Sequence, residues 1–358
     1  MAESCLPLLV QVLRAPATAA VLEAPDWDRL IRQARHANLL GRLAHRVADV
    51  CDMAALPPPV QRHLDSARNF AAAHARVVHW EVNRIRRALA PLEVPVILLK
   101  GAAYLLSGSP VAVGRVFSDV DILVPRARLD AVEESLYWAG WLTTHHDAYD
   151  QRYYRQWMHE LPPLRHVRRK TVLDVHHNIL PETARLHPDP EKLIAAAECI
   201  DAPDLHVLST EDRILHSATH LFHDGEFEHG LRDLVDLDGL IREAAGAEAR
   251  FWERLPARAD ELQLSRPLAY ALRYCREILG TPVPEAMRQW TDRALPGRVT
   301  RGLMDALMAR ALRPPHPSCE DAFTAPARWL LYVRGHALRM PPHLLLPHLL
   351  RKAVRSEE

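Results

Sequence analysis

Cysteine is scarce in this sequence of 358 residues, and its few cysteines follow no disulfide or metal-binding pattern. They are odd in number, scattered along the chain and without a Cys-x-x-Cys pair: Cys5, Cys51, Cys199, Cys275 and Cys319. A disulfide framework or a cysteine zinc site is therefore not expected, and a reducing compartment fits this usage best.

A net charge and long apolar runs are also absent. The 45 Lys and Arg residues balance the 45 Asp and Glu residues, so no overall field attracts nucleic acid, and a dedicated RNA or DNA binder is not expected. No run approaches the roughly 20 apolar residues that a bilayer span requires. The first residues only faintly resemble a signal peptide, because Glu3 replaces a basic residue and Gln11 and Arg14 interrupt the apolar segment. We therefore expect a cytoplasmic protein with no membrane span.

The remaining composition, 48% hydrophobic and 25% charged residues, is ordinary for a globular protein, and the length suits two or three compact units. Apolar residues recur at helical spacing over residues 26–50 and, in a longer pattern, over residues 60–90. Residues 341–355 are apolar and then basic, and they predict a docked C-terminal helix in preference to a segment that binds a membrane surface.

Two aspartates at the start of an apolar run are the centre of the sequence. Asp119 and Asp121 stand at the start of an apolar, largely β-branched run that ends at residue 124, so they are predicted at the mouth of a strand. Because strand side chains alternate between faces, both carboxylates point to the same side. Two like charges this close repel each other, and a fold keeps such a pair when a hard cation lies between them. Magnesium is the expected cation.

The segments on either side contain complementary features. Residues 94–99 form a buried-strand pattern that ends in Lys100-Gly101, and a helical pattern follows. A strand, a glycine and a helix N-terminus in this order predict an anion site, since free backbone N–H groups face the incoming charge. Downstream, a basic turn precedes a further predicted strand, residues 171–180, which contains a third carboxylate, Asp174.

These motifs, taken in order, resemble the polymerase-β-type nucleotidyltransferase superfamily. More narrowly, they are similar to poorly characterised bacterial nucleotidyltransferase-family proteins with a Lys-Gly variant of the first motif. The resemblance covers the middle quarter of the chain, and the residues that carry it are Lys100-Gly101, Arg115, Ser118-Asp119-Val-Asp121 and Leu-Asp174-Val-His176. The superfamily usually has Gly-Ser or Gly-Gly where Gly101-Ala102 stands here, so the lysine charge would replace a serine contact.

The resemblance implies a role for each matching residue. Asp119 and Asp121 would hold the metal ions that bridge the nucleotide phosphates. Asp174 would complete a second metal site and help to deprotonate the acceptor hydroxyl. Gly101 would let the backbone approach the triphosphate. The nucleotide-binding residues predicted in this way are Lys100, Gly101, Arg115 and Ser118.

Two of these residues have alternative interpretations. His176 lies two residues after Asp174, so on a strand it shares the face of that carboxylate and could orient an acceptor or accept a proton. A half-buried histidine that is bonded to a neighbour is the alternative. Arg115 lies in a glycine-containing loop before the aspartate pair, where a phosphate clamp is favoured over a solvated side chain.

The C-terminal half contains polar residues whose role stays open. A predicted helix from residue 209 places His216, His220 and His223 on one face, which is compatible with metal binding, although a polar seam between domains is favoured. The related proteins have a similar pattern at His220, Arg232-Asp233 and Asp236. These residues either frame the nucleotide or acceptor pocket or join helices as ion pairs.

We predict an α+β fold with a small mixed β-sheet nucleotidyltransferase core, residues 91–181, between helical regions at residues 1–90 and 182–358. The predicted function is Mg²⁺-dependent transfer, through a two-metal site, of a nucleoside monophosphate from an NTP to an acceptor hydroxyl, with release of pyrophosphate. A small molecule or a protein or peptide would be the acceptor, and RNA is disfavoured by the balanced charge. The alternative is a non-catalytic module that senses a nucleotide or binds a partner.

Overall fold

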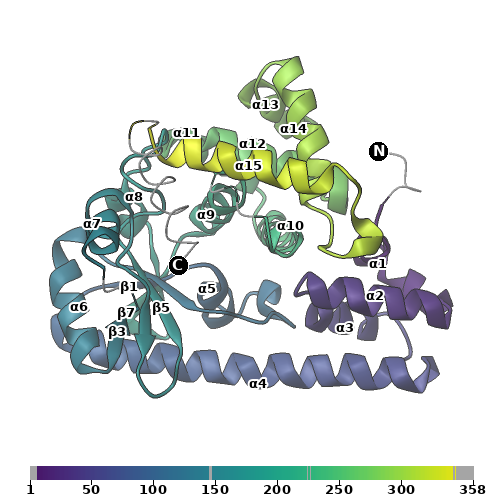
Figure 1. Cartoon of the computed structure of the whole chain (residues 1–358), viewed down its shortest axis with the longest axis horizontal. Helices are drawn as coiled ribbons and strands as arrows, with labels where there is room; N and C mark the ends of the chain where they lie inside the picture. Colours follow the sequence, from purple (N-terminus) through teal and green to yellow (C-terminus); the bar gives the residue numbers. More distant parts are fainter. Residues whose placement is uncertain (1–5, 145–146, 224, 226, 342, 344–358) are drawn as a thin grey trace.

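The protein is a mixed sheet flanked by helices, as the computed structural model in Figure 1 shows, and the predicted α+β class is confirmed. The structure describes residues 6–144, 147–223, 225, 227–341 and 343. Cys5 and nearly all of the predicted tail helix lie outside these residues.

Within the described residues, seven strands form one sheet in the order β3-β4-β5-β2-β1-β7-β6. The strands are β1 (Val96–Leu98), β2 (Val120–Leu123), β3 (Trp141–Thr143), β4 (Leu164–His166), β5 (Val172–His176), β6 (Glu198–Ile200) and β7 (Ala202–Val207). Strand β1 is antiparallel to β2 and parallel to β7, whereas β2 is parallel to β5. Every residue of β1 and β2 is buried, so the core lies at the centre of the sheet.

The α-helices precede, interrupt and follow these strands. They are α1 (Leu8–Arg14), α2 (Ala24–His36), α3 (Leu40–Ala48), α4 (Pro58–Leu89), α5 (Lys100–Leu106), α6 (Leu129–Trp138), α7 (Ala148–Trp157), α8 (Pro190–Ala195), α9 (Thr210–His223), α10 (Gly230–Ala247), α11 (Phe251–Glu261), α12 (Ser265–Tyr274), α13 (Glu285–Ala294), α14 (Arg298–Ala311) and α15 (Thr324–Arg339). None of these helices combines the length and the apolar content that crossing a bilayer would need.

The long helix α4 connects the N-terminal helices to the sheet. It runs along one side of the molecule, with α2 and α3 above one end and the strands above the other (Figure 1). Its buried residues recur at helical spacing, among them Val60, Leu64, Val78, Val82 and Ile85. This apolar face packs on α3, α5 and α6. The helix predicted over residues 60–90 is thus confirmed.

One charged residue on the buried face of α4 ties it to the strands. Glu81 accepts hydrogen bonds from Arg169 in the turn between β4 and β5, at 2.7 Å from Nη2, and from the Thr171 hydroxyl, at 3.0 Å. The Arg169 guanidinium also lies 4.7 Å from the centre of the Trp141 ring. These contacts hold the hairpin that leads into β5, the strand with the third predicted carboxylate.

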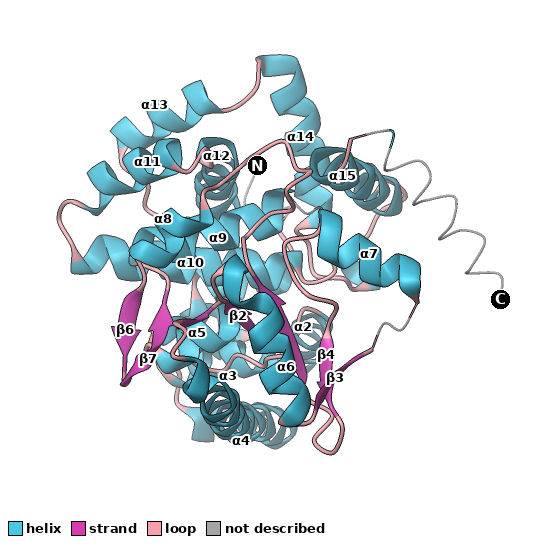
Figure 2. Ribbon diagram, turned by 90° about the vertical axis from the view of Figure 1, so that its left-hand side faces the viewer, coloured by secondary structure: helices cyan, strands magenta, loops and turns pink. Residues whose placement is uncertain are grey.

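One local prediction was wrong, and one helical pattern is divided between two elements. The stretch after residue 182 is not entirely helical, because β6 and β7 form a hairpin at the edge of the sheet, opposite the edge with β3 (Figure 2). These strands are short, and Asp201 turns between them with φ +52°, so they lack the long alternating pattern that would have predicted them. The helical pattern over residues 26–50 is also two helices, separated at Asn38, which has φ +56°.

Candidate active site

Strand pairing places two of the predicted carboxylates side by side. Strands β2 and β5 are parallel, and their register sets Asp121 opposite Asp174. Residues opposite each other on neighbouring strands project to the same face, so these side chains share one face of the sheet. Asp119 lies just before β2, where its carboxylate accepts a hydrogen bond from the Ser118 hydroxyl at 2.8 Å. The three predicted metal ligands therefore lie around one end of β2.

Lys100 enters the same group from the end of β1. The Leu99 N–H donates to the Asp121 carbonyl oxygen at 3.0 Å, which fixes the chain beside β2. Lys100 then adopts φ +43°, a left-handed conformation that costs a non-glycine residue roughly 1–2 kcal/mol. Its Nζ lies 3.4 Å from Asp121 Oδ1. The strained turn thus directs an ammonium group at a buried carboxylate.

His176 lies between two carboxylates. Its Nε2 is 3.2 Å from Asp121 Oδ1, and its Nδ1 is 3.3 Å from Glu160 Oε2. Glu160 reaches this position because it forms an isolated antiparallel bridge with His176. The sequence analysis did not identify Glu160, which lies in an irregular segment before β4, where no periodic pattern marks it. Nε2 of His176 is thus bonded to Asp121, whereas Nδ1 lies near Glu160 without a hydrogen bond among the described residues.

The charges of the site shift its pKa values in opposite directions. Burial, together with the charges of Asp121 and Glu160, raises the pKa of Asp174 to about 7. Burial and Asp121 also raise the pKa of Asp119. Burial alone would raise the pKa of Asp121, but Lys100 and His176 outweigh it and hold that pKa far below its usual range. Burial opposes ionisation of His176, yet Glu160 and Asp121 raise its pKa.

These carboxylates fit a divalent cation. Asp174 Oδ1 is buried and has no hydrogen-bond partner among the described residues. Burial is the main cause of the raised pKa of Asp174, and the negative charges of Asp121 and Glu160 add to it, so a cation bound between Asp119, Asp121 and Asp174 would remove that repulsion. Carboxylate oxygens are the ligands that Mg²⁺ prefers.

Gly101 and Arg115 lie behind the turn at Lys100. A Cβ atom at position 101 would overlap the Arg115 guanidinium and the Phe117 ring, so the close packing itself requires glycine. Arg115 is 8% exposed, and its Nε donates to Asp236 Oδ2 at 2.8 Å. Asp236 also pairs with Arg42 at 2.9 Å. Contact between Arg115 and a phosphate would therefore require this ion pair to open.

Helix α9 brings further histidines near the carboxylates. Burial and the nearby Lys100 charge lower the pKa of His216 to about 3 and also lower that of His220, so both imidazoles are neutral. Burial and two arginines, Arg334 and Arg339, lower the pKa of His223 to about 4. Within the described part of the chain, the three histidines do not form a group with metal-ligand spacing.

The residues that follow on α10 pair with one another or with other segments. Arg232 Nη2 lies 2.8 Å from Asp233 Oδ1, in a half-buried pair. Asp236, one turn further, faces Arg42 and Arg115, as described above. Asp236 therefore binds Arg115, and Arg115 packs against Gly101, the residue that follows Lys100.

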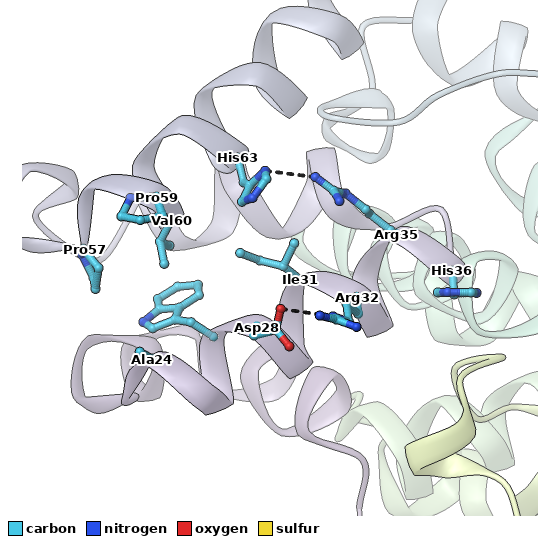
Figure 3. Close-up of a pocket in the computed structure, with 11 residues that line it drawn as sticks. Ala24, Asp28, Ile31, Arg32, Arg35, His36, Pro57, Pro59, Val60 and His63 are labelled. Carbon is cyan, nitrogen blue, oxygen red and sulfur yellow. Dashed lines mark hydrogen bonds and ion pairs between the residues drawn. The ribbon is translucent and has the colours of Figure 1, made fainter.

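A larger cavity lies at the other end of the molecule. It occupies about 600 Å³ between α2 and the start of α4. Figure 3 shows Arg35 paired with His63 and Arg32 paired with Asp28 along its wall. A much smaller cavity, about 50 Å³, adjoins Asp119. The catalytic candidate is therefore identified by the group of carboxylates and not by either of these two cavities.

Comparison with known proteins identifies the family of the chain. Residues 23–280 match a family described as uncharacterised nucleotidyltransferase, and because the match spans more than half of the chain, the protein belongs to this family. No curated protein and no solved structure matches the chain.

Proposed function

We propose that the protein is a Mg²⁺-dependent nucleotidyltransferase that transfers an NMP group from an NTP to an acceptor hydroxyl and releases pyrophosphate. The observation that carries this proposal is the placement of Asp121 opposite Asp174, with Asp119 adjacent and Asp174 Oδ1 buried without a partner. In a member of a nucleotidyltransferase family, metal binding is the function that best accounts for carboxylates that repel one another.

Three carboxylates would hold the metal, and two residues would receive the phosphates. Asp119, Asp121 and Asp174 would bind Mg²⁺, which when bound supplies charge neutralisation and alignment of the phosphates. Lys100 would provide a positive charge where the superfamily has a serine contact. Ser118 lies exposed next to Asp119, on the side from which a nucleotide could approach.

The remaining residues would act on protons and position. Asp174, with a pKa of about 7, is suited to accept the proton of the acceptor hydroxyl near neutral pH. His176 would hold Asp121 in place through its 3.2 Å contact. Arg115 would support the turn at Gly101 from behind. The task of the protein is mainly positioning, as expected for phosphoryl-type chemistry.

The acceptor is proposed to be a small molecule or a protein or peptide side chain. The balanced overall charge offers no general attraction for RNA. Labelled ATP, CTP, GTP and UTP should be incubated with the protein in cell lysate, and the label separated into small-molecule, protein and RNA fractions. We expect little label in RNA. Strong labelling there would refute the argument that a balanced net charge disfavours an RNA acceptor.

Nucleotide binding is the first test. We expect calorimetry with a panel of NTPs to detect binding that requires Mg²⁺ and is lost in Asp119→Asn. The matched control is Asp28→Asn, because Asp28 lies on α2, far from the site. This variant should bind like the unmodified protein. Absence of binding of any NTP at millimolar Mg²⁺ would contradict the proposal.

A nucleotide-sensing module is the alternative that one observation favours. Lys100 and His176 already occupy Asp121 Oδ1, at 3.4 and 3.2 Å, and this arrangement could serve binding without turnover. Pyrophosphate release separates the two functions. Nucleotide binding with no pyrophosphate released across a broad set of acceptors would favour the sensor.

A further inference from the structure

The segment before β4 places two side chains beside His176. The Leu161 N–H donates to the Val175 carbonyl oxygen at 2.8 Å, and the His177 N–H donates to the His159 carbonyl oxygen at 2.8 Å. These backbone hydrogen bonds attach residues 159–161 to the end of β5. The positions of His159 and Glu160 next to His176 are therefore set by the main chain.

Three side chains converge at this point. His159, Glu160 and His176 each offer one ligand atom, and these atoms all lie within 4.8 Å of one another. Nδ1 of His159 is buried and has no hydrogen-bond partner among the described residues. Because bonds from nitrogen or oxygen to a zinc ion are about 2.0–2.2 Å long, small side-chain rotations would bring the three atoms to ligand spacing.

The other nitrogen of His176 supports a ligand role. Nε2 lies 3.2 Å from Asp121 Oδ1, so an Nε2–H group can donate to that carboxylate and leave the lone pair of Nδ1 directed towards Glu160, 3.3 Å away. Metal-binding histidines commonly donate their second ring N–H to a carboxylate in this manner, which fixes the tautomer and the ring orientation.

We propose that His159, Glu160 and His176 form a binding site for a late first-row divalent cation, with Zn²⁺ the best fit. Two imidazoles and one carboxylate suit Zn²⁺, whereas Mg²⁺ prefers oxygen ligands alone. The site is separate from the three aspartates proposed for Mg²⁺, and the contact between His176 and Asp121 is its only direct link to them among the contacts described above. It does not depend on the proposed transfer reaction.

A cation at this site would stabilise the edge of the active site. It would hold residues 159–161 against β5 and fix His176, which in turn orients Asp121. Ligation requires both imidazoles to be neutral, so binding of the ion would release a proton from any imidazole that is charged. The same ion would neutralise the negative charge of Glu160, which contributes to the raised pKa of Asp174.

The test uses the full-length chain, stripped of metal with a chelator and titrated with Zn²⁺ by calorimetry and with Co²⁺ by visible absorption. We expect about one ion per chain at this site and a Co²⁺ spectrum of low coordination number. Glu160→Gln and His159→Gln should each weaken binding at least tenfold, on the order of the loss seen when the surroundings of a metal site are altered. His63→Gln, in the cavity near α2, is the control that should retain the affinity.

Thermal unfolding gives a readout that does not depend on activity. Zn²⁺ should raise the melting temperature of the unmodified protein and not that of Glu160→Gln. If Glu160→Gln does not fold, His159→Gln answers the same question. Equal Zn²⁺ affinity in the unmodified protein and in both variants would overturn the proposal. So would absence of Zn²⁺ and Co²⁺ binding in the unmodified protein, which would make His176 a protonated bridge between two carboxylates. If the unmodified protein binds NTP with Mg²⁺ but does not bind Zn²⁺, this inference alone is removed. If the unmodified protein binds Zn²⁺ at this site but no NTP, the proposed function alone is removed.

Discussion

Two groups of buried carboxylates differ in how their charge is balanced. On α10, Asp236 faces two arginines, Arg42 at 2.9 Å and Arg115 at 2.8 Å, and those cations lower its pKa despite burial. At the end of β2, the carboxylates outnumber the nearby cations, and the pKa of Asp174 rises to about 7.

The contrast distinguishes a structural ion pair from a candidate catalytic group. Asp236 joins α3 and the loop before β2 to α10, so its charge is used within the fold. Asp174 Oδ1 and Asp236 Oδ1 are both buried without a hydrogen bond among the described residues, but Asp236 Oδ1 lies 2.9 Å from Arg42, so only the charge of Asp174 is left for a ligand. Burial alone is common to both groups, and the sign of the local charge balance separates them.

The largest expected effect is a loss of stability in Asp236→Asn. This change leaves Arg42 and Arg115 buried without a compensating charge, and loss of one partner of a buried pair costs about 3–5 kcal/mol. Denaturant unfolding should measure this loss. Asp28→Asn is the control, because Asp28 and Arg32 form an exposed pair, 61% and 63% accessible, and should change stability by less than about 0.5 kcal/mol. A loss below about 1 kcal/mol in Asp236→Asn would remove the distinction between the two groups.

The second prediction concerns Asp174→Asn, which should reduce turnover without reducing stability. The amide keeps the volume of the side chain but lacks the charge needed by metal and acceptor, so turnover should fall by on the order of 10²-fold or more. Pyrophosphate release per folded molecule and the melting temperature should be measured on one preparation. A lower melting temperature with normal specific activity would show that Asp174 is a structural residue.

The sequence predicted the strands that carry the aspartates, because each has an apolar run next to a charged residue. It also predicted that Asp121 and Asp174 share a site. Glu160 could not be predicted, since an irregular segment brings it to His176 through an isolated bridge. The partner of Arg115 could not be predicted either. Asp236 lies 121 positions away along the chain, and a local pattern contains no information about such a contact.

The third prediction is a pH dependence that separates Asp174 from its amide variant. Because the folded-state pKa of Asp174 is raised to about 7, the folded protein holds an extra proton between the unfolded pKa, near 4, and 7. Its stabilising contribution is complete at low pH and is lost as the pH rises through 7. The stability of Asp174→Asn relative to the unmodified protein should therefore rise by about 2–3 kcal/mol between pH 5 and pH 8.

Denaturant unfolding at the two pH values measures this difference, and millimolar Mg²⁺ should reduce it at pH 8 by stabilising the unmodified protein alone. His176, whose pKa is also raised, adds a loss of stability above neutral pH to both proteins. Parallel stability curves for the two proteins from pH 5 to pH 8 would show that the pKa of Asp174 is not raised in the folded protein.

The smallest expected effect tests whether Asp238, two residues after Asp236, is less critical to the fold. Its side chain is 4% accessible, but its partners Arg242 and Arg46 are 43% and 28% accessible, and the Thr281 hydroxyl donates to it at 2.7 Å. Water can therefore solvate Arg242 when the charge is removed, and the amide oxygen of an asparagine can still accept from Thr281. Asp238→Asn should cost about 1–2 kcal/mol, well below Asp236→Asn.

Thr281→Val should cost about 1 kcal/mol, and the double variant should cost less than the sum, because both changes remove one hydrogen bond. A cost for Asp238→Asn equal to that for Asp236→Asn would mean that burial of the carboxylate, and not the exposure of its partners, sets the stability of these pairs.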